Sequence, residues 1–220
     1  MGSDTHILAF DTSAAHCAAA LLSGHSLGSL REENMGRGQA ERLMPLLDET
    51  LTEAGLGWND LSAIGVGTGP GNFTGIRISV ATARGLALAL GIPAIGVTRF
   101  DTLAFGQPRP CITLVDAPRG QVYLQRFEES GAAPPKLSML DEIDARSGYL
   151  NQRWIGSHAE ECAARLSGVV SEPTLAGVEA IARIAANRIE TNTTPPAPLY
   201  IRPADAAPAR DAAPELLDDT

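Results

Sequence analysis

The strongest constraint on this chain is a glycine-rich turn between an apolar run and a long alanine-rich stretch, at residues 64–77. Phe73 and Ile76 begin an apolar pattern of helical spacing that continues to about residue 90. The stretch predicts a strand, a tight turn and a helix whose N-terminal N–H groups suit a phosphate or carboxylate. Three glycines leave the turn free to take positive φ and to approach a neighbour closely: Gly69, Gly71 and Gly75.

This turn does not match either common phosphate-binding motif. No Lys-Ser/Thr pair follows the glycines, as a P-loop requires, and their spacing differs from the dinucleotide-binding fingerprint. Taken alone, the stretch favours a plain strand-to-helix connection over a ligand site.

Composition narrows the class of protein. A chain of 220 residues forms one large domain or two small ones, and its net charge of -9 argues against a free-standing nucleic-acid binder. Lys136 is the only lysine and lies in a Pro-rich loop, which leaves little basis for a catalytic lysine. Cys17, Cys111 and Cys162 lack metal-ligand or redox spacing and predict reduced thiols. Because we find no signal peptide and no apolar run long enough for a membrane, we expect a cytoplasmic protein.

The first hundred residues predict the order β-β-β-α-β-α-β, which forms a mixed sheet covered by helices. We expect Pro45 to kink the first helix or delay its start. The predicted strands cover residues 7–13, 16–22, 25–31, 63–67 and 94–97, and the predicted helices cover 38–54 and 73–90.

The second half resembles a reduced copy of the first. Its predicted strands cover residues 111–116, 121–127, 136–140, 153–156 and 199–202, and its helices 141–150, 158–166 and 175–189. We therefore expect an N-terminal lobe at 1–104, a smaller C-terminal lobe at 105–202, and a flexible tail at 203–220. A β-rich unit repeated once around a cleft is the plan of the actin-like ATPase fold (ASKHA, ribonuclease H-like), an α/β fold of two tandem βββαβα-type lobes.

Asp11 is the first candidate for chemistry. It ends the first strand, where sheets of this kind bind ligands, and it is followed by Thr12 and Ser13. One hypothesis makes Asp11 a metal-water or phosphate-site acid, with Asp116 at the matching place in the second half. The other makes all three residues turn caps. The sequence around Asp11 is compatible with both hypotheses.

Other catalytic or metal-binding patterns are weak. His158 and Cys162 stand four apart on a predicted helix, but no third ligand is near in the sequence, so a surface histidine beside a buried thiol is the better interpretation. Ser13 and Ser79 have no evident histidine partner, and His16 and His25 fit solvent-facing hairpin positions better than a site.

Small residues recur along the helix that starts at Phe73, and they would let another helix approach closely. Packing inside the chain is the alternative. Together with the first helix this predicts half of a four-helix interface. The residues expected there are Leu43, Leu46, Leu47, Phe73, Ile76, Arg77, Ser79, Val80 and Ala83.

Three segments together closely resemble the bacterial TsaB (YeaZ) family: residues 7–13, 69–78 and 85–93. The resemblance covers residues 7 to about 105, and beyond that only the layout and residues 200–202 match. It implies an actin-like protein of the tRNA threonylcarbamoyladenosine (t6A) pathway, whose older label is glycoprotease-like (M22 peptidase-like).

The resemblance also implies partners. TsaB proteins are non-catalytic partners of a TsaD-type transferase, working with a TsaE-type ATPase, and the helix face above would pair with TsaD or with a second copy in a homodimer. The resemblance implies that this chain contacts transfer RNA only as part of the complex. No cofactor is required, although weak ATP or ADP binding at the subunit junction, through Asp11, Thr12, Ser13, Gly69 and Gly71, is compatible with this role.

One departure from the catalytic relatives bears on mechanism. TsaD-type proteins carry a His-x-Glu-Gly-His metal motif after the long helix and the next strand, but residues 97–102 here contain no histidine. Asp101 alone cannot hold a catalytic ion, so we expect no metal site and no catalytic residue.

Two alternatives remain. A stand-alone actin-like ATPase or kinase would use Asp11 and Asp116, but it lacks a second phosphate loop after Asp116. A metallopeptidase is disfavoured by the missing histidine pair.

Overall fold

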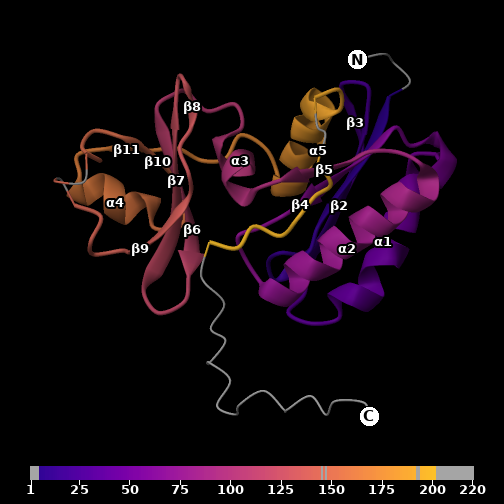
Figure 1. The fold of residues 1–220 in the computed structure, drawn as a ribbon, viewed down its shortest axis with the longest axis horizontal. Helices are drawn as coiled ribbons and strands as arrows, with labels where there is room; N and C mark the ends of the chain where they lie inside the picture. Colours follow the sequence, from indigo (N-terminus) through magenta and orange to yellow (C-terminus); the bar gives the residue numbers. More distant parts are fainter. Residues whose placement is uncertain (1–4, 145, 147, 192–193, 202–220) are drawn as a thin grey trace, which may run out of the picture.

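The computed structural model describes residues 5–144, 146, 148–191 and 194–201. It contains two sheets side by side, each with helices packed on it (Figure 1). The first sheet has the order β3-β2-β1-β4-β5, and the second runs β11-β10-β6-β7-β8, with β9 also paired to β7. The order of strands and α-helices from His6 to Val97 is β-β-β-α-β-α-β, which confirms the order predicted for the first hundred residues.

The first sheet is built from β1 (His6–Asp11), β2 (His16–Ser23), β3 (Ser26–Asn34), β4 (Ala63–Gly67) and β5 (Ala94–Val97). β1 pairs antiparallel with β2 and parallel with β4. Side chains alternate along β1: Leu8 and Phe10 join the core under α1 and α2, whereas Ile7 and Ala9 join the core under α5. Burial on both faces explains why this strand reads as a continuous apolar run.

Helices cover both faces of this sheet. α1 (Gln39–Glu53) and α2 (Phe73–Leu90) lie on one face, and α5 (Gly177–Arg188) lies on the other (Figure 1). α2 has the predicted bounds, with Asn72 as its N-cap and Gly91 in the left-handed region at its C-cap. α5 comes from the range expected in the second lobe, yet it packs on the first sheet. Gly65 allows this close approach, because a Cβ there would lie 3.0 Å from the Ala185 Cβ.

The second sheet contains β6 (Cys111–Ala117), β7 (Gln121–Glu128), β8 (Gly131–Ala132), β9 (Lys136–Met139), β10 (Arg153–Gly156) and β11 (Val169–Val170). α4 (Ala159–Arg165) packs on one face and α3 (Arg99–Ala104) on the other, so α3 lies between the two sheets. The strand that ends in Asp116 and its partner across the 118–120 turn are confirmed.

Parts of three sequence expectations are wrong. α1 begins at Gln39 and contains Pro45, so the helix does not start late at the proline, while a kink there stays a prediction. The described residues of 141–150 form turns and no α-helix. Residues 199–201 are extended but join no sheet, since they follow Pro195, Pro196 and Pro198, which cannot donate to a ladder.

Two further expectations have other outcomes. The tail at 203–220 lies outside the described residues, and the bounds of the two lobes stay a prediction.

The helix α3 was not predicted, although its capping box is visible in the sequence. The Thr98 hydroxyl accepts from the Asp101 N–H, and the Asp101 carboxylate accepts from the Thr98 N–H.

Gly75 and Gly85 offer a matched test of the contact between α2 and β1. A Cβ at Gly75 would lie 1.8 Å from the Thr12 carbonyl oxygen, whereas a Cβ at Gly85 would meet nothing within 4 Å. Gly75→Ala should lower the free energy of unfolding by about 2 kcal/mol or more. Gly85→Ala should raise it by about 0.5–1 kcal/mol, because alanine is the better helix former. Urea denaturation measures both, and equal stabilities would contradict the proposed contact.

Candidate functional site

Asp11 lies at the C-terminal end of β1, as predicted, within a small polar cluster. His16 Nε2 lies 3.1 Å from Asp11 Oδ2, and the Ser13 hydroxyl donates to the same oxygen at 2.9 Å. The Ser13 N–H donates to Asp11 Oδ1 at 2.9 Å. Gly67 on β4 leaves room for the carboxylate, because a Cβ there would lie 2.3 Å from Asp11 Oδ1. The carboxylate is thus held by groups of its own chain.

The cluster shifts the pKa of both members of the pair. Burial raises the pKa of Asp11, but hydrogen bonds and charge from His16, with the Ser13 hydrogen bonds, outweigh it and leave the pKa below its ordinary value. The hydrogen bond to Asp11 raises the pKa of His16 against the opposing effect of burial, and the charge of Glu32 adds to the rise. Arg99 acts in the opposite direction. The geometry therefore favours an ion pair between His16 and Asp11.

Asn72 satisfies two of the N–H groups at the start of α2. Its Oδ1 accepts from the Thr74 and Gly75 N–H groups at 3.0 and 3.1 Å. The Asn72 N–H donates to the Ser13 carbonyl at 2.6 Å. The chain itself satisfies these donors, and an anion site at this helix start stays a prediction.

The glycines serve packing instead. A Cβ at Gly71 would lie 2.2 Å from the Ser13 carbonyl oxygen, and Gly69 adopts φ 87° with its carbonyl accepting from the Arg99 N–H. Thr12 is buried and donates its hydroxyl to the Gly75 carbonyl at 2.7 Å. Thr12 thus joins β1 to α2, while nucleotide binding through Asp11, Thr12, Ser13, Gly69 and Gly71 stays a prediction.

Two adjoining cavities lie where the lobes meet. The smaller, of about 270 Å³, is lined by Asp11, His16 and Glu32 among others. The larger, of about 830 Å³, is lined by Phe73, Arg77, Asp116, Tyr123 and Tyr200 among others. Both share Ser13, Ala14 and Arg99. The structure thus brings Asp11 and Asp116 to neighbouring cavities, although Asp116 is exposed and pairs with His158 at 3.1 Å.

Most of the predicted interface residues are buried in the core of this chain, which corrects that prediction. These residues lie on the buried faces of α1 and α2, so their side chains are not available to a partner: Leu43, Leu46, Leu47, Ile76, Ser79, Val80 and Ala83. Phe73 and Arg77 are exposed. Apolar helical spacing marked the correct helices but selected the faces that the sheet covers.

The exposed face of α2 carries different residues, which we call the α2 outer face: Phe73, Arg77, Ala81, Arg84, Gly85 and Leu88. Leu88 is 85% exposed and Phe73 is 53% exposed. Exposed positions at spacings of three and four could have identified this face once the buried one was known.

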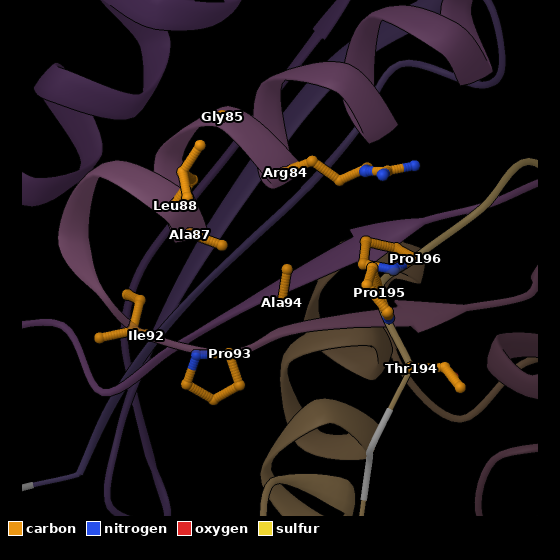
Figure 2. A pocket seen from close by; sticks show the side chains of 10 residues that line it. All are labelled: Arg84, Gly85, Ala87, Leu88, Ile92, Pro93, Ala94, Thr194, Pro195 and Pro196. Carbon is orange, nitrogen blue, oxygen red and sulfur yellow. The ribbon is translucent and has the colours of Figure 1, made fainter.

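A groove of about 580 Å³ borders the C-terminal half of this face (Figure 2). α2 supplies one wall through Arg84, Ala87 and Leu88, and Pro195 and Pro196 lie opposite. Arg84 is the charged residue among the lining side chains. The groove is therefore an apolar surface with a cation at its rim.

The remaining candidates have structural roles. Asp101 caps α3 and lies 3.3 Å from Arg188, and Cys162 is buried. Within the ranges that the structure describes, no group of three His, Cys, Asp or Glu side chains is placed to hold a metal ion. α2 is also long and apolar enough to cross a membrane by length and composition, contrary to our expectation from the sequence. Here one of its faces packs on the first sheet.

Comparison with known proteins gives consistent matches. A family model described as "TsaD: tRNA N6-adenosine threonylcarbamoyltransferase" matches residues 33–147, over half of the chain. The tRNA threonylcarbamoyladenosine biosynthesis protein TsaB of Escherichia coli is 35% identical over 127 residues, 56% of this chain and 54% of that protein. The TsaB protein of Buchnera aphidicola is 31% identical over 160 residues, 68% of this chain and 76% of that protein.

Among solved structures, YeaZ from Pseudomonas aeruginosa superposes with a TM-score of 0.68 at 24% identity. That superposition covers 89% of this chain and 99% of YeaZ. Two sheets, each sandwiched by helices around an interlobe cavity, define a protein of the actin-like fold. The chain belongs to the TsaB (YeaZ) family.

The Asp11–His16 pair predicts a distinct dependence on pH. His16 has a raised folded pKa, so its contribution to stability is complete below about pH 6.5 and is lost as pH rises through that pKa. Asp11 has a lowered pKa, so its contribution is present above about pH 3.8 and is lost as pH falls through that pKa. The stability lost on Asp11→Asn should therefore be largest between these values.

Titration of the His16 ring by NMR tests the pair directly. Asp11→Asn should lower the pKa of His16, and Glu32→Gln should lower it less, because the Asp11 hydrogen bond is the larger cause. An unchanged His16 titration in Asp11→Asn would show that the pair does not form.

Proposed function

We propose that this chain is a subunit of the machinery that makes tRNA threonylcarbamoyladenosine, and that it acts by binding a TsaD-type transferase. The relatives named for this pathway support the proposal. The observation that carries the mode of action is the α2 outer face, where Leu88 is 85% exposed beside an apolar groove. A contiguous exposed apolar surface of this kind is typical of protein interaction sites.

We further propose a TsaE-type ATPase as a second partner and self-association when the transferase is absent. The small residues Ala81 and Gly85 would allow a helix of the partner or of a second copy to approach α2 closely. Transfer RNA would be held by the other subunits, because a chain with a net charge of -9 repels its phosphates. This division of labour fits a cytoplasmic complex.

The same proposal makes the chain catalytically inactive. Asp11, the acid that an actin-like ATPase or kinase would need, is bound by His16 and Ser13. The N–H groups that would receive a phosphate are bound by Asn72. Asp101, the acid nearest the position of the missing metal motif, caps α3. Each feature disfavours the stand-alone ATPase and the metallopeptidase.

Co-purification with a TsaD-type protein, followed by a t6A assay with and without this chain, tests the function. We expect a complex and a dependence of t6A formation on the chain. ATP turnover by the isolated chain, without any complex, would support the ATPase alternative instead.

Substitutions on α2 test the surface. Gly85→Arg and Leu88→Arg place a large cation on the α2 outer face, and we expect each to weaken partner binding at least about tenfold with the fold intact. Leu27→Arg is a matched control, because Leu27 is 39% exposed on the edge strand β3. Isothermal calorimetry measures partner binding and thermal melting measures stability, so together they separate a loss of binding from a loss of the fold.

The buried positions give the opposite pattern. Ser79→Arg or Ala83→Arg should unfold the chain, since both side chains are fully buried. If Gly85→Arg and Leu88→Arg bind as well as Leu27→Arg does, the α2 outer face is not the docking surface.

A further inference from the structure

Residues 194–201, which we call the strap, run from the first lobe to the second along the larger interlobe cavity (yellow in Figure 1). Pro196 packs near Gly96 on β5, where an added Cβ would lie 3.3 Å from the Pro196 Cβ. The Leu199 N–H donates to the Thr68 carbonyl at 2.9 Å, just after β4. The strap is thus fastened to the first sheet at two places.

The side chains at the end of the strap point in alternate directions. Leu199 and Ile201 pack against the apolar cluster of the second lobe that contains Phe100 and Val115. Tyr200, between them, faces α2 of the first lobe. This alternation is what an extended segment produces, and it places one short stretch in contact with both lobes.

Tyr200 meets two residues of the first turns of α2. Arg77 Nε donates to the Tyr200 hydroxyl at 2.9 Å, and the Tyr200 and Phe73 rings lie 5.5 Å apart between centroids. The Arg77 guanidinium lies 3.7 Å from the centroid of the Phe73 ring. Two neighbouring side chains of α2 and one from the strap, 123 residues beyond Arg77, therefore form one stacked cluster on the wall of the cavity.

We propose that the Phe73–Arg77–Tyr200 cluster is a latch that holds the strap along the larger interlobe cavity, so that release of Tyr200 widens the opening of this cavity. The cluster is half-exposed, with Phe73 at 53% and Tyr200 at 51%, so its contacts are weak enough to break without unfolding a lobe. The prolines of the strap cannot pair with β5, which leaves the strap separable from the sheet. The proposal does not depend on any partner.

The cavity beside the strap is partly open, because Phe73, Arg77 and Asp116 on its wall are exposed. It is lined mainly by apolar and aromatic groups, including Ala14, Pro118 and Tyr123, and it contains the Arg99 and Asp116 side chains. Its volume of about 830 Å³ is within the range of small-molecule sites. The latch therefore controls access to a space large enough for a ligand.

Hydrogen exchange of the full chain tests the latch at the Leu199 amide. Tyr200→Ala and Arg77→Ala should accelerate its exchange about tenfold, and Tyr200→Phe, which keeps the ring but loses the hydroxyl, should accelerate it less. Leu27→Ala and Leu30→Ala are controls with exposed side chains on β3, at the edge of the first sheet opposite β5 and the strap, and should leave the rate unchanged. Amides of β1 and β2 should keep their protection in every variant.

Access to the cavity is tested with a thiol. Cys17, Cys111 and Cys162 are buried, so Ala14→Cys reports labelling by a small maleimide from the cavity wall. We expect labelling about tenfold faster when Tyr200→Ala is added. An unchanged Leu199 amide, an equal loss of protection throughout both sheets, or an unchanged labelling rate would each overturn the proposal.

Discussion

The structure depends on a backbone contact between the end of β1 and the first turn of α2. Glycine at position 75 brings the helix against the Thr12 carbonyl, and the Asn72 N–H donates to the Ser13 carbonyl. With no side chains between them, the two segments have one arrangement. This contact sets where α2 lies on the sheet, and therefore also sets the cavity wall and the helix face left exposed.

The same contact also shapes the interlobe site. The Thr74 and Gly75 N–H groups at the start of α2 are used by Asn72, and Asp11 lies in hydrogen-bond contact with His16. Our proposal of an inactive subunit rests on these internal contacts, because they use groups that could meet a phosphate or a metal-bound water. The surfaces that we propose for other molecules are the α2 outer face and the cavity beside the strap.

Local patterns predicted most elements correctly. A continuous apolar run marked β1, the Ser23-Gly24 turn marked the hairpin of β2 and β3, and the flanking turn residues marked both ends of α2. α3 was not predicted, although Thr98 and Asp101 form a capping box, because a helix of 6 residues is too short to show a helical apolar period. The final strand was wrong because residues 199–201 satisfy the strand pattern but join no sheet: they are held by the Leu199 N–H bond to the Thr68 carbonyl and by side-chain contacts such as Arg77 to Tyr200.

The sequence by itself determined most elements and their order, since these depend on periodicity, capping and turn residues close together in the chain. The family was indicated separately, by the resemblance of the glycine turn and the first strand to TsaB proteins. Tertiary structure decided which face of α2 is buried, that α5 returns to the first sheet, and that Asp11 pairs with His16. It also joined Arg77 to Tyr200, 123 residues apart. An apolar residue fits a core and an interface equally well, and only the packing of distant segments selects between them.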